Sequence, residues 1–294
     1  MSTLSVPAVK PARGLGDLRL WLVLAALVVL YAPTVAWLWD RWTMSVWHNA
    51  HGMLIPIVVA YFVRDELSRY EGPAEPGSVW GFAWLVPALL MHVFDVAMHT
   101  QLLSAASIVV ALPGLSLLFL GPGRTRAILF PLLFLAFMLP IPLGVTERLH
   151  LALRHLTAAG VSEFLAVMGV PIFLENLTLQ SGESRLFVAD ACSGFSTLYA
   201  ALTVACLTAY FCPVPWRRAA VLLAAAPIAI GANILRVALL VMLVRWYGEG
   251  ILDTSAHELS GILTFVLALP LIFWIGSPPP PPRASDHAGP ASAQ

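Results

Sequence analysis

Residues 219–247 read AAVLLAAAPIAIGANILRVALLVMLVRWY, an apolar run in which Arg236 is the charged residue that stands well inside. A helix needs about 20 apolar residues to cross the hydrocarbon core of a bilayer. The run therefore predicts a membrane-spanning helix. A charge inside such a helix costs about 2.5–3.5 kcal/mol on insertion scales, so we expect Arg236 to have a specific role.

The whole chain has the same apolar character. Of its 294 residues, 59% are hydrophobic and 11% are charged, whereas soluble domains carry roughly 25% charged residues. Sixteen basic residues balance sixteen acidic ones, so the chain lacks the basic excess of a nucleic-acid binder. The composition excludes a soluble, a disordered and a nucleic-acid-binding protein, and it indicates a multi-pass membrane protein in contact with lipid.

Apolar runs predict an all-α membrane protein with about eight transmembrane helices. They cover residues 18–39, 50–63, 78–98, 101–120, 126–145, 192–211, 219–247 and 258–276. We expect residues 18–276 to form one membrane domain, preceded by a cytoplasmic segment, 1–17, and followed by a Pro-rich disordered cytoplasmic tail, 277–294. With both termini inside, ten of the sixteen basic residues fall in cytoplasmic segments, as the positive-inside rule requires.

Residues 146–190 differ from the apolar runs. Leucines alternate with charged residues and histidines over 146–167, which predicts an amphipathic helix in the outer membrane interface. Residues 172–188 alternate on both sides of Gln180-Ser181-Gly182-Glu183, which predicts a short β-hairpin with a Ser-Gly turn. An open hairpin cannot cross lipid, so we expect both elements to cover a site on the outer side.

Cys192 stands in Ala191-Cys192-Ser193-Gly194, at the outer end of the sixth run. The free N–H groups and dipole of a helix N-terminus would favour a thiolate there. Gly194 would let a substrate backbone approach closely. The alternative is a small buried apolar side chain, as for many free cysteines. We expect Cys206 and Cys212 to be packing residues.

Two later residues complete a candidate catalytic set with Cys192. Asn233 and Arg236 share one face of the seventh helix, where Arg236 either makes a structural ion pair, extends to the interface, or binds an oxyanion. His257 opens the eighth run and serves either as a polar cap or as a general acid and base. The topology brings Cys192, Arg236 and His257 to the outer face, and a thiol, a guanidinium and an imidazole suit acyl transfer.

The sequence resembles the exosortase/archaeosortase family of integral membrane cysteine transpeptidases. The resemblance covers about residues 45–270 and rests on the ordered segments Ala191-Cys192-Ser193-Gly194, Asn233-Ile234-Leu235-Arg236-Val237 and His257 with Gly261, and more weakly on His51–Pro56 and Phe137–Pro142.

The resemblance implies that Cys192, Arg236 and His257 are catalytic, with no cofactor and no metal. We add as supporting residues Ser193, Gly194, Asn233 and His51. The family's substrates are secreted proteins with a C-terminal sorting signal, which consists of a motif such as Pro-Glu-Pro, a membrane helix and a basic cluster. A cell-envelope acceptor receives the new carboxyl end, often in bacteria that make exopolysaccharide. The implied location is the bacterial inner membrane, with the active site facing the periplasm.

One departure from the family pattern leaves the recognised motif open. Many relatives have an arginine soon after Cys-Ser-Gly, where this chain has Phe195-Ser196-Thr197.

Three other interpretations stay open. A metal or haem protein would use histidines of the outer half, which are His48, His51, His92, His99, His150, His155 and His257. A small-molecule transporter would bind an anion at Arg236, although the internal symmetry of many transporters is not evident. A serine mechanism would pair Ser193 or Ser196 with His257.

Overall fold

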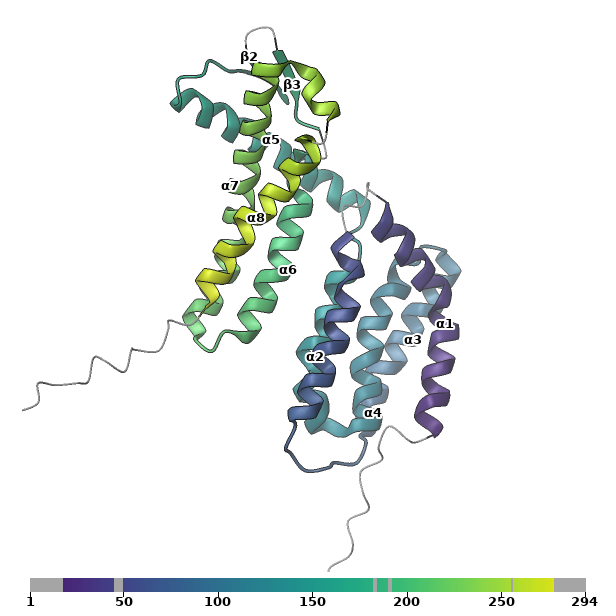
Figure 1. Ribbon diagram of the computed structural model, residues 1–294. Coiled ribbons are helices and arrows are strands. Elements are labelled where there is room, and N and C mark those ends of the chain that lie inside the picture. Colours follow the sequence, from purple (N-terminus) through teal and green to yellow (C-terminus); the bar gives the residue numbers. More distant parts are fainter. Residues whose placement is uncertain (1–17, 45–49, 182–183, 190–191, 255, 278–294) are drawn as a thin grey trace, which may run out of the picture. The chain divides into compact units, whose positions relative to one another are not determined.

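The computed structural model describes residues 18–44, 50–181, 184–189, 192–254 and 256–277 (Figure 1). The chain divides into two compact units, Met1–Leu143 and Gly144–Gln294. The predicted segment 1–17 and the predicted tail 277–294, apart from Ser277, lie outside the described residues.

The first unit is helical. Its elements are α1 (Leu18–Thr43), η2 (Ala50–Met53), α2 (Ile55–Arg69), η3 (Val79–Gly81), α3 (Phe82–Met98), α4 (Leu102–Phe134) and η4 (Leu135–Met138). Short 3₁₀ turns, labelled η, connect or extend the longer helices.

The second unit combines helices with a small sheet. Its elements are α5 (Leu143–Val167), β1 (Phe173–Glu175), β2 (Thr178–Ser181), β3 (Ser184–Phe187), α6 (Phe195–Phe211), α7 (Pro215–Tyr247), η6 (Glu249–Asp253) and α8 (Ala256–Gly276).

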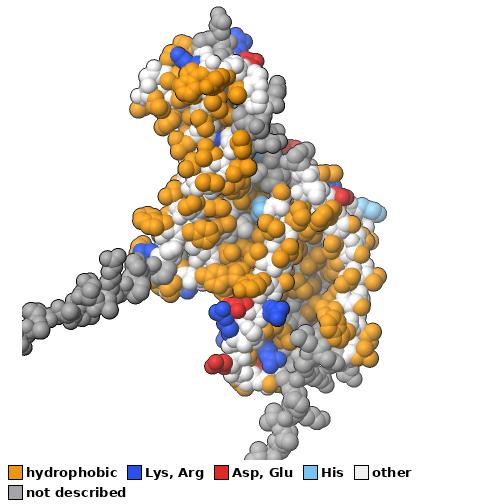
Figure 2. All heavy atoms as spheres, in the orientation of Figure 1, with side chains coloured by type: hydrophobic (Ala, Val, Ile, Leu, Met, Phe, Trp, Pro, Cys, Tyr) orange, Lys and Arg blue, Asp and Glu red, His pale blue; other side chains and the backbone are white. Residues whose placement is uncertain are grey.

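Five helical segments of the described chain are long and apolar enough to cross a membrane. They are Trp21–Thr43, Val79–Met98, Leu102–Met138, Pro215–Tyr247 and Leu259–Gly276. Figure 2 shows hydrophobic side chains over the visible face of the helices in both units, as lipid contact requires. The prediction of a multi-pass helical membrane protein is confirmed, whereas eight spans are not, because the described residues contain five candidate spans.

The difference in number has local causes. The run predicted at 50–63 forms α2, which has 15 residues and ends in a charged segment that includes Arg64, Asp65 and Arg69. The run predicted at 192–211 forms α6, which is apolar but has 17 residues. The runs at 101–120 and 126–145 are joined in α4, whose helical path ends earlier than predicted, at Phe134.

α4 turns back on itself at Gly121, where φ is +79° and ψ is 171°. The hydroxyls of Ser116 and Thr125 lie 2.8 Å apart, whereas nine residues of a straight helix span about 13.5 Å. The two halves of α4 therefore form a helical hairpin. Pro122, the first residue of the second half, suits that position because the first turn of a helix leaves its N–H groups unpaired.

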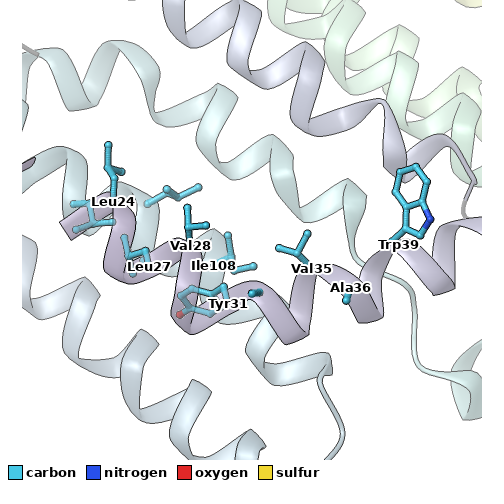
Figure 3. A pocket seen from close by; sticks show the side chains of 12 residues that line it. Leu24, Leu27, Val28, Tyr31, Val35, Ala36, Trp39 and Ile108 are labelled. Atoms are coloured by element: carbon cyan, nitrogen blue, oxygen red, sulfur yellow. The ribbon is translucent and has the colours of Figure 1, made fainter. Parts of the chain in front are cut away.

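Polar side chains connect the helices of the first unit in its interior. Asp95 on α3 accepts a hydrogen bond from the N–H of Leu103 (3.2 Å) and so caps α4. The hydroxyl of Tyr31 on α1 lies 2.7 Å from that of Ser107, and its ring contacts His92 edge-on at 4.6 Å. Beside Tyr31, an apolar groove of about 720 Å³ follows α1 from Leu24 to Trp39 against α4 (Figure 3).

Small residues let the helices of the second unit approach closely. Ala201 and Ala205 of α6 are buried in one cluster with Ala225 and Ala229 of α7 and Ile272 of α8. Close approach of this kind is typical of helix packing in membranes. α7 packs against both α6 and α8, so it can hold side chains between its two neighbours.

The helix and the hairpin predicted over 146–190 are both present. α5 buries Leu153, Val161 and Leu165 and exposes Leu151 and Leu156 on other faces, so it carries apolar side chains on both its buried and its exposed faces. β2 and β3 pair antiparallel up to Ser181 opposite Ser184, and their turn at 182–183 lies outside the described residues. The prediction missed β1, which pairs with β2, because three residues are too few to show alternation.

Candidate active site

Cys192 lies between β3 and α6 in the second unit. α6 begins at Phe195, with Gly194 at the N-cap and φ +78°. Cys192 therefore precedes the helix and does not open it as predicted. Its side chain is buried, and its backbone N–H donates to the carbonyl of Ala189 (2.9 Å). Glycine suits position 194 because L residues rarely adopt a positive φ.

Asn233 of α7 contacts this loop directly. Its Nδ2 donates hydrogen bonds to the carbonyl oxygen of Cys192 (3.0 Å) and to the hydroxyl of Thr157 on α5 (3.1 Å). Gly194 lies so close that an added Cβ would be 2.5 Å from Asn233 Cγ. The structure thus brings together Cys192, Gly194 and Asn233.

Arg236 follows Asn233 by about one helical turn and is buried as well. Its Nε donates to the hydroxyl of Ser260 on α8 (3.1 Å). Its charge also interacts with the thiol of Cys192. Arg236 therefore connects the cysteine loop with the first turns of α8, and this accounts for a charged side chain in an apolar helix.

Burial raises the pKa of the Cys192 thiol. The positive charge of Arg236 and a backbone hydrogen bond with Ala189 act in the opposite direction, but burial is the larger effect. The sequence predicted that a helix N-terminus would favour the thiolate. In the structure the protonated thiol is favoured, so the nucleophile would need a base or a change in its surroundings.

His257 is the second residue of α8. Its side chain lies outside the described part of the structure. Residues three and four apart share a face of a helix, so the position of His257 is on the same face as those of Ser260 and Gly261. A Cβ at Gly261 would lie 3.9 Å from a guanidinium nitrogen of Arg236. The helix spacing thus places His257 on the face that meets Arg236.

His150 and Ser260 contact predicted site residues, although the sequence analysis named His150 only as a metal-binding candidate and did not name Ser260. The Nδ1 of His150 lies 2.9 Å from the hydroxyl of Ser193, and its ring contacts Phe195 at a centroid distance of 4.6 Å. The sequence did contain a signal for His150. His150 and Thr157 are seven residues apart on α5, and both are polar residues on the face that includes the apolar Leu153. The serine alternative paired Ser193 with His257, whereas the described partner of Ser193 is His150.

His51 lies in the first unit, in η2, whereas Cys192, Asn233 and Arg236 belong to the second unit. Burial lowers its pKa to about 4. The neighbouring Gly52 contacts Trp42, whose indole N–H donates to the carbonyl of Met138 (2.9 Å). The two weaker segments of the family resemblance, 51–56 and 137–142, therefore meet within the first unit.

A metal site in a protein needs several ligand side chains close together. In the described ranges, no three side chains of His, Cys, Asp or Glu form a group that could hold a metal ion. Two histidines of the metal interpretation have other contacts, since His92 meets Tyr31 and His150 meets Ser193.

Comparison with known families identifies the chain. A family model described as transmembrane exosortase (Exosortase_EpsH) matches residues 39–274. Comparisons with curated proteins and with solved structures gave no match. The matched range covers most of the chain and includes Cys192, Arg236 and His257, and the protein is therefore a member of the transmembrane exosortase family.

Proposed function

We propose that the protein is a membrane cysteine protease and transpeptidase that cleaves the C-terminal sorting signals of secreted proteins. The observation that carries the proposal is that one helix, α7, binds the carbonyl oxygen of Cys192 through Asn233 and buries Arg236 one turn later, where its charge acts on the thiol. Family membership supports the same chemistry. A buried charge near a nucleophile fits catalysis better than packing. Burying a charge costs free energy, and packing alone does not offset that cost.

Each residue has a role in the proposed reaction. His257 takes the proton of the Cys192 thiol, and the resulting thiolate attacks the carbonyl carbon of the scissile peptide. Arg236 stabilises the oxyanion that forms. His257 then donates a proton to the leaving amine as the C–N bond breaks, and a thioester remains on Cys192.

The second half of the reaction releases the substrate. A nucleophile of the cell envelope, or water, attacks the thioester carbonyl and restores the thiol of Cys192. We propose that the substrates carry a Pro-Glu-Pro type motif followed by a membrane helix and a basic cluster. The active site would face the periplasm from a bacterial inner membrane, with both termini in the cytoplasm. We propose that the reaction is linked to exopolysaccharide production.

The test is co-expression with a tail-anchored secreted protein that carries such a signal. Wild-type protein should shorten this substrate, and Cys192→Ala, Arg236→Ala and His257→Ala should leave it uncut. The C-terminal mass of the product separates hydrolysis, which adds water, from transfer, which adds the acceptor. Cys206→Ala, on α6, is the matched control and should process normally.

Two outcomes would change the proposal. Processing by all three variants at the wild-type rate would refute the mechanism. Cys192→Ser should lose activity, because a serine hydroxyl is a weaker nucleophile than a thiol near neutral pH. Full activity of this variant would therefore assign the nucleophilic role to a hydroxyl.

A further inference from the structure

α5 carries polar side chains on the face that it buries. Thr146, His150 and Thr157 are 6%, 8% and 2% exposed, and they share this face with Leu153 and Val161. A buried polar group destabilises the fold unless it is hydrogen-bonded. The partners of these side chains therefore indicate what the face is for.

Two of these polar side chains bind the cysteine loop or its support. His150 pairs with the hydroxyl of Ser193 (2.9 Å), and Thr157 accepts a hydrogen bond from Asn233 (3.1 Å). Ala158, Val161 and Leu165 of α5 pack in the cluster that contains Cys192. The polar part of α5 is thus directed at the loop that holds the proposed nucleophile.

Ser193 is held by two contacts at once. Its hydroxyl accepts a hydrogen bond from the N–H of Phe195 (3.3 Å) and also pairs with His150. A hydroxyl has one hydrogen and two acceptor sites, so it can satisfy both partners. The ring of Phe195 covers the imidazole at 4.6 Å and keeps it in place.

The peptide that joins Cys192 to Ser193 is consequently fixed from two helices. Asn233 of α7 binds the carbonyl oxygen of Cys192 (3.0 Å), and His150 of α5 binds the side chain of Ser193. The direction of the Cys192 side chain depends on this backbone. Its distance from the charge of Arg236 therefore depends on both anchors.

We propose that His150 is a positioning residue, which fixes Ser193 and through it directs the thiol of Cys192 toward Arg236. In this role the imidazole acts through the hydroxyl of Ser193, with which it pairs at 2.9 Å. The expected effect on turnover rests on the proposed function, whereas the effect on the thiol itself does not.

Two measurements test the proposal on the full-length protein. The first is kcat and KM for processing of the tail-anchored substrate. The second is the rate at which iodoacetamide alkylates Cys192 in a Cys206→Ser/Cys212→Ser background, which requires no substrate. The variants are His150→Ala, His150→Asn and Ser193→Ala, with His155→Ala as the matched control because His155 is exposed on the same helix.

We expect His150→Ala to lower kcat about tenfold with KM nearly unchanged, as for one lost positioning hydrogen bond. Cys192 should be alkylated faster, because its loop loses an anchor. His150→Asn should restore both values, since an amide can occupy the place of Nδ1. Ser193→Ala should match His150→Ala, and the double variant should be no worse than either.

Other results would overturn the inference. Unchanged alkylation and unchanged kcat in His150→Ala would show that Ser193 needs no anchor. Equal loss of kcat in His150→Ala and His150→Asn, with normal alkylation in both, would show that the imidazole transfers a proton instead. Absence of processing by the wild type, together with the expected alkylation changes, would contradict the proposed function and support the positioning role.

Discussion

The side-chain amide of Asn233 donates a hydrogen bond of 3.0 Å to the carbonyl oxygen of Cys192, although 41 residues separate them in the chain. Asn233 and Arg236 lie one turn apart on α7, so a single helix face fixes the cysteine backbone and supplies the nearby charge. A rigid helix is a precise support for such an arrangement.

Gly194→Ala should destabilise the protein and disturb this contact. The new Cβ would lie 2.5 Å from Asn233 Cγ, at a backbone φ of +78°, and a non-glycine residue in this conformation costs about 1–3 kcal/mol. The measurement is the thermal midpoint in detergent. Gly231→Ala on α7 is the control, because nothing lies within 4 Å of its added Cβ and alanine favours a helix. Equal midpoints for the two variants would contradict the prediction.

Arg236→Gln should raise the pKa of Cys192 further. The guanidinium opposes the effect of burial on the thiol, so its loss leaves burial alone. The pH at which alkylation of Cys192 reaches half its maximal rate should increase, in a Cys206→Ser/Cys212→Ser background. Arg236→Lys keeps the charge and should stay nearer the wild type. An identical midpoint in Arg236→Gln and wild type would show that the charge does not act on the thiol.

Stability should also depend on pH through this thiol. The pKa of the Cys192 thiol is higher in the folded protein than in the unfolded chain. The thiol therefore makes its full contribution to the free energy of unfolding at pH values below its pKa in the unfolded chain. The contribution is lost as pH rises through the folded value. Unfolding of wild type and Cys192→Ala should therefore converge in alkaline solution, and a constant difference between them would contradict this.

His51 should make stability sensitive to acid. Burial lowers its pKa to about 4, from 6.5. The neutral imidazole therefore stabilises the fold above pH 6.5, and this contribution is lost as pH falls toward 4, by about 2–3 kcal/mol at pH 4.5. Denaturant unfolding of wild type and His51→Gln between pH 7.5 and 4.5 measures the effect. His155→Gln, at an exposed position, should lose as much stability at low pH as the wild type does. The same loss in His51→Gln would contradict the prediction.

The hairpin in α4 can be tested by cross-linking. The hydroxyls of Ser116 and Thr125 lie 2.8 Å apart, so Ser116→Cys/Thr125→Cys should form a disulfide under mild oxidation. Mass spectrometry of the peptide that contains both positions measures this. A continuous helix would hold the two positions about 13.5 Å apart along its axis, and the pair would then stay reduced. Both variants are made in a background without Cys192, Cys206 and Cys212, where Ser116→Cys alone has no second thiol in its chain and serves as the negative control.

Several features were predictable because they depend on local sequence. The apolar runs are long enough to show which segments meet lipid, and the alternation around Gln180 shows the hairpin β2–β3. The order of the segments around Cys192, Arg236 and His257 identified the family, and the family match over residues 39–274 confirms it. Boundaries were not predictable in the same way: the runs at 101–120 and 126–145 are joined through the turn at Gly121, and α4 gives way to the 3₁₀ turn η4 after Phe134.

The sequence by itself determined membrane residence, the helical class and the residue types available for chemistry, since hydropathy and charge are sums over neighbouring residues. Only the tertiary structure decided that Asn233 holds Cys192, that Arg236 bonds Ser260, and that His150 on α5 anchors Ser193. These contacts join segments 24 to 43 residues apart. They follow from how the helices pack, which no local pattern encodes.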